Sequence, residues 1–297
     1  MSPTKSSPTL FDKDTLLTIE TRLSELTLKH ACESPTLHSA INYSLLNGGK
    51  RLRALLAKAS SQLLNSKNNN WVDCACAMEM LHCYSLIHDD LPAMDDDNLR
   101  RGKATNHIKF NEATAILAGD ALLTMAFEVL ANTALNNQIK IKQIQILAKA
   151  SGANGMVAGQ SIDLASTGKE IDFEQLKNMH KLKTGALILA SVQIGALCEP
   201  NITHDQQNTL KQYAEKIGLA FQVIDDVLDV ESDTQTLGKP QGSDFEANKS
   251  TYVKHLGLEK AKQTALDLVD DACEKIEFFK HSKNLNDIAQ FVLNRKF

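Results

Sequence analysis

The amino-acid sequence predicts an all-α fold organised as one domain. Only 6 prolines and 14 glycines interrupt the 297 residues, and aromatic residues make up 5% of the chain. Apolar residues recur at intervals of three and four positions over most of its length, the spacing of helices with one buried face. No strand-like alternation, internal repeat or linker separates these segments. Although chains of this length often form two domains, we expect a single domain over residues 1–297.

Composition narrows the class of protein. Hydrophobic residues make up 43% of the chain, enough for a large core, and the formal net charge of −4 indicates neither nucleic acid nor a membrane surface as a partner. The first residues, MSPTKSSPTL, lack the apolar run of a signal peptide. No uninterrupted apolar stretch of about eighteen residues suggests a membrane span. The six cysteines lack paired Cys-x-x-Cys spacing, so we expect free thiols in a cytoplasmic protein rather than a zinc site.

The first part of the chain contains a basic segment between predicted helices. Helical periodicity begins at Asp12 and is broken at Ser34-Pro35, and a short helix follows over residues 37–46. The segment NGGKRLR (47–53) then places two glycines ahead of a helix whose first turn is basic. Free amides and cations converge at such a helix start, which suits an anion. A solvated basic turn explains the same pattern equally well.

The stretch HDDLPAMDDDNLRRG (88–102) contains five aspartates, followed at once by two arginines. A long helix that opens at Trp71 leads into it, and Pro92 ends this helix just after Asp89. Carboxylates at the negative end of a helix dipole are unfavourable, and their mutual repulsion adds to that cost. The pattern therefore favours a bound divalent cation over the alternative, a solvated acidic loop. His82 precedes Asp89 by two helical turns and shares its face.

Three predicted helices occupy the middle of the chain. The helix at 113–131 is apolar on nearly all sides except at Asp120, which predicts deep burial. The helix at 141–164 carries three glycines on one face, which lets a neighbouring helix or a ligand approach closely. The third helix, at 173–197, contains Lys183.

A second acidic cluster lies on the predicted helix at 206–230. Its motif FQVIDDVLD (221–229) places three aspartates and a glutamine on one arc, with no lysine or arginine one turn away to balance them. Amphipathic helices at 258–279 and 285–292 finish the chain. The aspartates of the first of these are interleaved with lysines and indicate an ordinary solvated face.

Two acid clusters on different helices, with dispersed cations, describe a diphosphate site. Mg²⁺ takes one or two carboxylates and completes its coordination with water and phosphate oxygens, so facing clusters would hold a diphosphate through bridging ions. The cations expected to neutralise the rest are Arg100, Lys183, Lys239 and Lys249. A second, metal-free anion pocket would consist of Lys50, Arg53, Arg101 and His82. Two such pockets suggest two diphosphate substrates.

Several segments carry a family resemblance. They are, in chain order, GGKRLR (48–53), YSLIHDDLPAMDDDNLRRG (84–102), AGDALL (118–123), GQSID (159–163), KTGALI (183–188), FQVIDDVLD (221–229), TLGKPQGSD (236–244) and KSTY (249–252). Through these segments the chain resembles the trans-prenyltransferases, and within them the bacterial-type farnesyl diphosphate synthases, which are short-chain polyprenyl diphosphate synthases. The two-residue spacer Pro92-Ala93 in the first aspartate motif is similar to that of the bacterial and plastid-type enzymes.

The resemblance implies an all-α bundle of the isoprenoid synthase type, with a central active-site cavity, and a homodimer. It implies that Asp89, Asp95 and Asp225 bind Mg²⁺ and, together with Lys183 and Arg100, carry the catalytic step. The residues implied to contact the allylic diphosphate are Arg100, Lys183, Thr184, Gln222, Lys239 and Lys249. Those implied to bind isopentenyl diphosphate are Gly49, Lys50, Arg53, His82 and Arg101.

The implied reaction is the Mg²⁺-dependent head-to-tail condensation of isopentenyl diphosphate with dimethylallyl or geranyl diphosphate to give farnesyl diphosphate. It begins with ionisation of the allylic diphosphate. Tyr84, five residues before Asp89, favours the fifteen-carbon product, because in the resembled enzymes a bulky ring there helps to close the product pocket. A purely structural role for that ring is the alternative. Ala54 departs from the family, which usually has proline there.

Other functions fit the residues less well. A geranylgeranyl diphosphate synthase of the same family is the alternative for the product. A class I terpene cyclase binds a single diphosphate, so the basic pocket at Lys50, Arg53 and Arg101 argues against it. A di-iron bundle needs Glu-x-x-His pairs, which these clusters lack. A non-catalytic partner subunit would have no use for both acid clusters and all of the cations.

Overall fold

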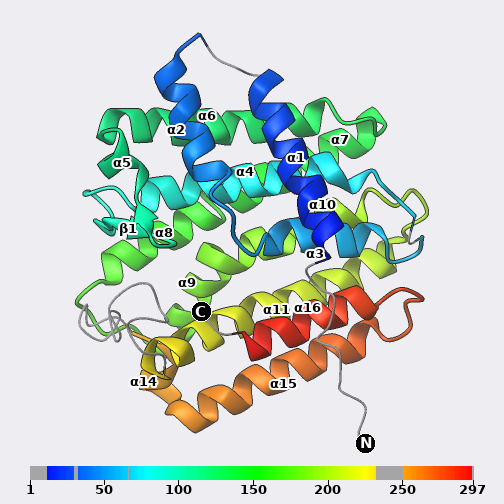
Figure 1. Cartoon of the computed structure of the whole chain (residues 1–297). Coiled ribbons are helices and arrows are strands. Elements are labelled where there is room, and N and C mark those ends of the chain that lie inside the picture. Colours follow the sequence, from blue (N-terminus) through cyan, green and yellow to red (C-terminus); the bar gives the residue numbers. More distant parts are fainter. Residues whose placement is uncertain (1–11, 30–32, 66, 232–249, 296–297) are drawn as a thin grey trace, which may run out of the picture.

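The computed structural model describes residues 12–29, 33–65, 67–231 and 250–295, and this part of the chain is almost entirely helical (Figure 1). The strands β1 (Leu99–Arg100) and β2 (Lys103–Ala104) form one small antiparallel hairpin. The helices are α1 (Lys13–Lys29), α2 (Pro35–Leu45), α3 (Leu52–Ser61), α4 (Trp71–Asp89), α5 (Asn106–Lys109), α6 (Glu112–Ala131), α7 (Asn137–Ser151), α8 (Met156–Ser166), α9 (Phe173–His180), the π-helical turn η1 (Lys181–Gly185), α10 (Ala186–Ala196), α11 (His204–Glu231), α14 (Tyr252–Leu256), α15 (Leu258–Ile276) and α16 (Lys283–Asn294). The predicted all-α fold is confirmed.

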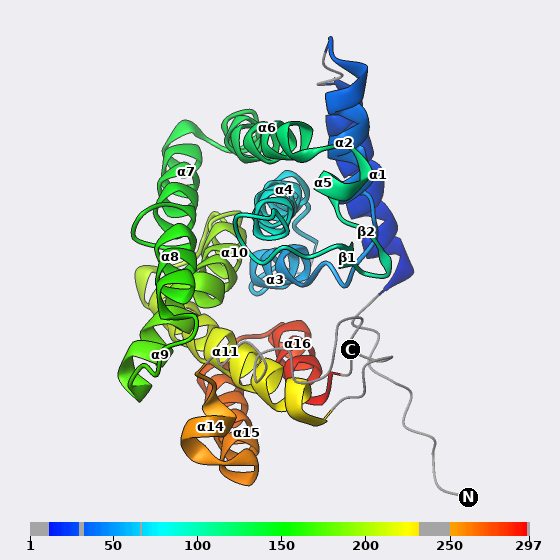
Figure 2. The same cartoon turned by 90° about the vertical axis from the view of Figure 1, so that its left-hand side faces the viewer.

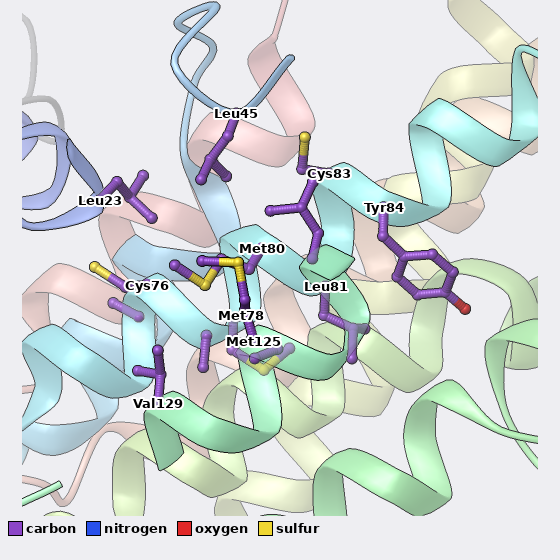
Figure 3. Packing of buried hydrophobic residues seen from close by; sticks show 14 of the residues in the cluster. Leu23, Leu45, Cys76, Met78, Met80, Leu81, Cys83, Tyr84, Met125 and Val129 are labelled. Carbon is purple, nitrogen blue, oxygen red and sulfur yellow. The ribbon is translucent and has the colours of Figure 1, made fainter. Parts of the chain in front are cut away.

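Helix α4 lies in the middle of the bundle. Figure 2 shows α6 above it, α3 below it, α10 toward α7 and α8, and α1 and α2 on the opposite side. Helices α11 and α16 lie below α3, and α14 and α15 lie outermost. One buried cluster surrounds α4 and includes apolar side chains of α1, α2, α6 and α10 (Figure 3). A second joins α3 and α10 to α11, α15 and α16. Burial on several sides explains why α4 lacks a continuous polar face.

The single helix predicted at 141–164 is wrong. The helix α7 ends at Ser151 and α8 begins at Met156, and the glycines between them leave the helical conformation. A Cβ atom on Gly155 would lie 2.1 Å from the carbonyl oxygen of Ala150, so this close turn of the backbone requires glycine. The glycine pattern was thus a helix break as well as a packing face.

The predicted deep burial of α6 is wrong for one of its faces. The face toward α4 is buried, whereas Ile116 and Leu117 on the outer face are 43% and 56% exposed. By length and composition alone α6 could cross a membrane, and 44% of its most apolar 18-residue segment is buried. One such helix is weak evidence, because a helix packed within a fold passes the same test.

The predicted helix at 173–197 is a continuous helical run made of α9, η1 and α10. Glycines from two other helices pack against its π-helical turn. A Cβ on Gly159 of α8 would lie 2.2 Å from the amide nitrogen of Lys183, and a Cβ on Gly218 of α11 would lie 3.0 Å from the Cα of Gly185. π-helical turns often occur at functional sites, and this one carries Lys183 and Thr184.

Candidate active site

Two cavities with shared walls lie between α4, η1 and α11. The acid-lined cavity has a volume of about 1020 Å³ and is bordered by the aspartates of α4 and α11 and by the basic segment before α3. The apolar cavity has a volume of about 670 Å³. Asp89, Arg100, Lys183, Gln222 and Asp225 line both cavities. A ligand with a charged head and an apolar chain would therefore find both environments side by side.

Every predicted site residue that the structure describes lines one of these cavities. Those at the acid-lined cavity are Gly49, Lys50, Arg53, His82, Asp89, Asp95, Arg100, Arg101, Lys183, Gln222 and Asp225, and Thr184 lines the apolar cavity. Lys239 and Lys249 lie outside the described residues. The structure thus brings together residues separated by most of the chain, while their individual roles stay predictions.

Adjacent aspartates of the first cluster have different surroundings. Helix α4 ends at Asp89, and the following Asp90, 3% exposed, forms an ion pair of 2.5 Å with Arg100. The amide of Asp95 donates a hydrogen bond of 2.9 Å to the carbonyl oxygen of Asp89, which brings the loop back toward the helix end. Within the described chain, no lysine or arginine forms an ion pair with Asp89 that would match the one at Asp90.

The charge of Asp89 is poorly compensated in the folded chain. The pKa of Asp89 is raised to about 6, mainly by burial; Lys183 opposes this shift, and the neighbouring Asp95 adds to it. The next residue along the loop, Asp96, has a left-handed backbone with φ of 53°. Non-glycine residues adopt this conformation at a cost, and such residues often cluster at functional sites. A cation beside Asp89 and Asp95 would relieve the repulsion.

In the second cluster, on α11, both Asp225 and Asp226 have partners within the chain. The carboxylate of Asp226 accepts a hydrogen bond of 2.7 Å from the amide of Tyr252, so this side chain anchors α14. Asp225 faces the cavity and forms an ion pair of 2.5 Å with Arg295. The guanidinium of Arg295 also lies 3.6 Å from the centre of the Phe221 ring. Sequence reasoning missed Arg295, because a lone arginine seventy residues from its partner carries no local signal.

The turn η1 presents two polar side chains to the cavities. The ammonium of Lys183 lies 2.5 Å from the carboxylate of Asp163, and the hydroxyl of Thr184 donates a 2.5 Å hydrogen bond to the side-chain oxygen of Gln222. Burial alone would lower the pKa of Lys183, but Asp163 and Asp89 together raise it, so the ammonium stays charged. Sequence reasoning did not identify Asp163 as this partner.

The predicted basic first turn of α3 is wrong in detail. The helix starts at Leu52, and Arg51 precedes it with a left-handed backbone, φ 47°. The Arg51 side chain is buried in ion pairs with Glu20 at 2.6 Å and Glu79 at 3.3 Å. The other carboxylate oxygen of Glu79 accepts a hydrogen bond of 3.1 Å from the amide of Ala54. The side chain of Arg51 is therefore occupied in holding the helices together. Of the basic residues in this segment, Lys50 and Arg53 remain to line the cavity.

The remaining basic residues form a pocket with unmatched positive charge. Burial lowers the pKa of Arg53 to about 10. Burial, together with Arg53 and Arg101, lowers the pKa of His82 well below its ordinary value, so the imidazole is neutral near pH 7. Nε of Arg53 and Nδ1 of His82 are buried without a hydrogen-bond partner in the described chain. Buried polar groups normally have partners, so this pocket is suited to an anion that accepts several hydrogen bonds.

Gly49 is explained by this pocket. Its φ of 117° is unfavourable for side chains, and a Cβ there would lie 2.5 Å from Nη1 of Arg101. The same guanidinium donates a hydrogen bond to the carbonyl oxygen of Gly48. Glycine at this position therefore lets Arg101 lie flat against the backbone, beside Arg53 and His82.

The acid clusters fit Mg²⁺ in the manner that this ion prefers. No three His, Cys, Asp or Glu side chains in the described part of the chain are arranged as a metal site on their own. Mg²⁺ usually takes one or two carboxylates and obtains its other ligands from water and substrate phosphates. Asp89 and Asp95 on one side and Asp225 on the other offer oxygen ligands of this kind. The arrangement suits an ion shared with a diphosphate rather than a protein cage.

Tyr84 lines the apolar cavity and also packs against the core. It is 6% exposed, and its ring meets the ring of His88 edge-on at 5.4 Å. In Figure 3 it lies at one end of the buried cluster, with its hydroxyl directed away from Met78 and Met125. Nε2 of His88 lies 3.0 Å from the carbonyl oxygen of Ile116, which ties this wall to α6. Tyr84 can therefore both pack in the core and form part of the wall of the apolar cavity.

Comparison with known proteins identifies the family of this chain. Residues 34–290 match the family model described as Polyprenyl synthetase. A farnesyl diphosphate synthase of Haemophilus influenzae is 49% identical over 262 residues, which cover 88% of this chain and 89% of that protein. The chloroplastic geranylgeranyl pyrophosphate synthase 7 of Arabidopsis thaliana is 44% identical over 266 residues, covering 88% and 76%.

A solved structure extends the agreement to the fold. The geranyltransferase from Helicobacter pylori, complexed with magnesium and isoprenyl diphosphate, has a TM-score of 0.87 at 34% sequence identity, covering 99% of this chain and 100% of that one. The family model spans the basic pocket, both acid clusters and η1. The chain therefore belongs to the polyprenyl synthetase family.

Proposed function

We propose that this protein is a Mg²⁺-dependent prenyltransferase that condenses isopentenyl diphosphate with dimethylallyl and geranyl diphosphate to give farnesyl diphosphate. One observation carries the proposal: a single cavity contains two facing acid clusters and, apart from them, a basic pocket with unpaired donors. This provides one place for a diphosphate held through metal and another for a diphosphate held by side chains alone. The similarity to farnesyl diphosphate synthases supports it.

The allylic diphosphate belongs between the acid clusters. Asp89, Asp95 and Asp225 would hold Mg²⁺ there, in the manner of an ion that takes one or two carboxylates and obtains its other ligands from water and phosphate. Lys183, Arg100, Thr184 and Gln222 line the same space and contact its remaining oxygens. Lys239 and Lys249 are assigned to this diphosphate by family resemblance alone. Its prenyl chain extends into the apolar cavity past Tyr84.

Isopentenyl diphosphate belongs in the basic pocket. Gly49, Lys50, Arg53, His82 and Arg101 line this part of the acid-lined cavity. The unpaired donor on Arg53 has an acceptor once a diphosphate is present. Neutral His82 donates a hydrogen bond without requiring another carboxylate nearby. Binding in this pocket needs no metal, which distinguishes the two substrates.

The chemistry follows from these positions. When bound, Mg²⁺ supplies Lewis-acid stabilisation of the negative charge that develops on the leaving diphosphate. Lys183 and Arg100 add fixed positive charge at the same place. The double bond of isopentenyl diphosphate then attacks the allylic carbon, and a proton passes to the released diphosphate. The apolar walls keep water from the carbocation, so no nucleophilic side chain is required.

We assign the fifteen-carbon product to this protein rather than the twenty-carbon one. The buried ring of Tyr84, fixed against His88, forms part of the wall along which the chain grows. A geranylgeranyl diphosphate synthase is the second candidate, favoured by the similarity to the Arabidopsis thaliana enzyme. The larger identity to farnesyl diphosphate synthases supports the shorter product.

We also propose the organisation and location of the protein. The helices pack around a shared set of buried clusters, which supports a single domain over residues 1–297. The exposed apolar side chains Ile116 and Leu117 on α6 support a homodimer that covers this face. A cytoplasmic location is in line with six cysteines that lack paired Cys-x-x-Cys spacing.

Equilibrium binding tests the two-pocket arrangement. Calorimetry should show that isopentenyl diphosphate binds equally well with and without Mg²⁺, whereas a non-reactive geranyl diphosphate analogue requires Mg²⁺. Asp89→Ala should weaken only the analogue, and Arg53→Gln should weaken only isopentenyl diphosphate, each by about tenfold or more. Asp267→Ala, on the solvated face of α15, is the control. Equal dependence of both ligands on Mg²⁺ would overturn the assignment.

A further inference from the structure

A third large cavity lies on the opposite side of the α9–η1–α10 run from the candidate active site. This lysine groove has a volume of about 1070 Å³ and is lined by residues of α7, α9, η1, α10, α11 and α15. Its rim carries Lys149, Lys177, Lys181, Lys211, Lys216 and Lys275. Its floor includes the half-buried leucines Leu182, Leu189, Leu219 and Leu268. The family motifs described above assign no role to most of these residues.

The groove concentrates positive charge. Six lysines and two glutamates line it, a formal balance of +4 (6 − 2) on a chain whose net charge is −4. Three of the six lysines are paired: Lys177 with Glu174 at 3.0 Å, Lys211 with Glu215 at 3.9 Å and Lys216 with Asp271 at 2.7 Å. No carboxylate of the described chain forms an ion pair with Lys149, Lys181 or Lys275. Such clustering is unfavourable by itself and favours an anion in the groove.

The floor selects among anions. Four leucines from four different elements converge below the lysines, and none of them is fully buried. An inorganic anion would leave these leucines in water, and a neutral lipid would leave the lysines unpaired. A molecule with one phosphate-bearing head and one aliphatic or prenyl chain satisfies both surfaces. A flat membrane does not reach the floor of a concave groove.

The groove and the active site share a wall. Along η1 and α10, Lys183, Thr184 and Leu187 line the reaction cavities, while Lys181, Leu182 and their neighbours Gly185, Ala186 and Leu189 line the groove. The two sets alternate along a single helical run. Gly218 packs closely on Gly185, because a Cβ on Gly218 would lie 3.0 Å from the Cα of Gly185. A shift of this turn on the groove side therefore moves Lys183 on the other.

We propose that the lysine groove binds an anionic amphiphile and that its occupancy alters how Lys183 and Thr184 hold the allylic diphosphate. The binding does not depend on the proposed function, whereas the effect on Lys183 rests on it. The ligand is defined by its chemistry, a phosphate or diphosphate head on a single apolar chain. Both a prenyl diphosphate and a lipid-derived alkyl phosphate have this chemistry.

Calorimetric titration of the full chain with dodecyl phosphate tests the binding. Excess inorganic diphosphate and Mg²⁺ keep the active site occupied during the titration. We expect one site in the unmodified protein, at least tenfold weaker binding in Lys149→Glu/Lys275→Glu, and unchanged binding in the control Lys142→Glu/Lys280→Glu. The control makes the same change in net charge on exposed lysines outside the groove. No binding, or equal loss in both variants, overturns the proposal.

Two further arms complete the test. Leu189→Gln should weaken dodecyl phosphate binding, because it makes the floor polar, and equal affinity would contradict the apolar half of the site. The titration is then repeated with farnesyl diphosphate. Tighter binding of farnesyl diphosphate than of dodecyl phosphate would identify a prenyl diphosphate as the ligand, and the reverse order would identify a lipid-derived phosphate.

Kinetics test the coupling. We compare the KM for geranyl diphosphate with and without saturating dodecyl phosphate. The change in KM should be at least twofold larger in the control variant Lys142→Glu/Lys280→Glu than in Lys149→Glu/Lys275→Glu. Equal changes would show that the amphiphile acts only in the active site and would overturn the coupling. If the protein has no condensation activity at all, the proposed function fails, and the calorimetric result still decides whether the groove binds.

Discussion

Neighbouring aspartates in this protein differ in what they can do. Asp90 and Asp226 are engaged by Arg100 and by the amide of Tyr252, and Asp225 is paired with Arg295, whereas Asp89 has no such ion pair within the described chain. The sequence distinguished the cluster on α11 from the aspartates of α15, because only the latter are interleaved with lysines, with Lys275 one turn after Asp271. It did not reveal Asp163 or Arg295, because the charge pairs that they form join distant segments.

Removing one proposed metal ligand should strongly impair catalysis. We expect Asp225→Ala to lower kcat/KM for condensation by about 100-fold or more, because charge on the leaving diphosphate loses its stabilisation. Asp267→Ala, an exposed aspartate on α15, should leave the rate unchanged. Steady-state rates with both variants decide the matter. Equal rates for the two would exclude Asp225 from the reaction.

The neutral state of His82 predicts a pH dependence of stability. The pKa of His82 is lowered in the folded protein, first by burial and then by Arg53 and Arg101. The unfolded chain therefore takes up a proton near pH 6.5 that the folded chain resists, and stability falls as the pH drops below that value. The loss of stability should be smaller in His82→Gln. Urea midpoints at pH 7 and pH 5 measure the difference, and an equal decrease in both proteins would contradict the prediction.

At the scale of elements, glycines determine where helices meet and where they break. Gly155 breaks the long helix that periodicity predicted, and Gly159 lets α8 contact the backbone of η1. Periodicity identifies a helix by its apolar stripe, but a stripe continues across a break when both halves face the same core. The π-helical turn was also beyond prediction, because its one extra residue leaves no compositional signal.

Gly159 provides a test of how η1 is positioned. A Cβ at this position would lie 2.2 Å from the amide nitrogen of Lys183, so Gly159→Ala must displace the turn. We expect kcat/KM to fall by about tenfold or more, since small displacements of a positioning group are costly. Ala165→Ser, on an exposed position of the same helix, serves as the control. Unchanged rates in Gly159→Ala would mean that Lys183 does not need its present position.

At the scale of the whole molecule, the all-α class agrees with what the sequence indicated, and the predicted site residues that the structure describes line two adjoining cavities. The predicted deep burial of α6 is wrong for one face, because an apolar composition does not distinguish a helix covered by its own chain from one with an exposed face. Ile116 and Leu117 lie on that face. The composition of α6 is explained if a second copy covers it.

The exposed face of α6 leads us to predict a homodimer. We expect light scattering after gel filtration to give about twice the chain mass of 32.6 kDa for the unmodified protein. Leu117→Glu should shift the protein toward the monomer, because it places a charge in the covered face. Leu266→Glu, at an exposed leucine of α15, should leave the mass unchanged. A monomeric unmodified protein would contradict the homodimer.

The central claim is that one cavity holds two diphosphates and joins their chains. The most direct measurement supplies purified protein and Mg²⁺ with labelled isopentenyl diphosphate and geranyl diphosphate, then sizes the extracted, dephosphorylated product. We predict a single fifteen-carbon alcohol, farnesol, whose formation stops when Mg²⁺ is chelated. A twenty-carbon product would keep the reaction and correct its length. The absence of any condensed product would contradict the account.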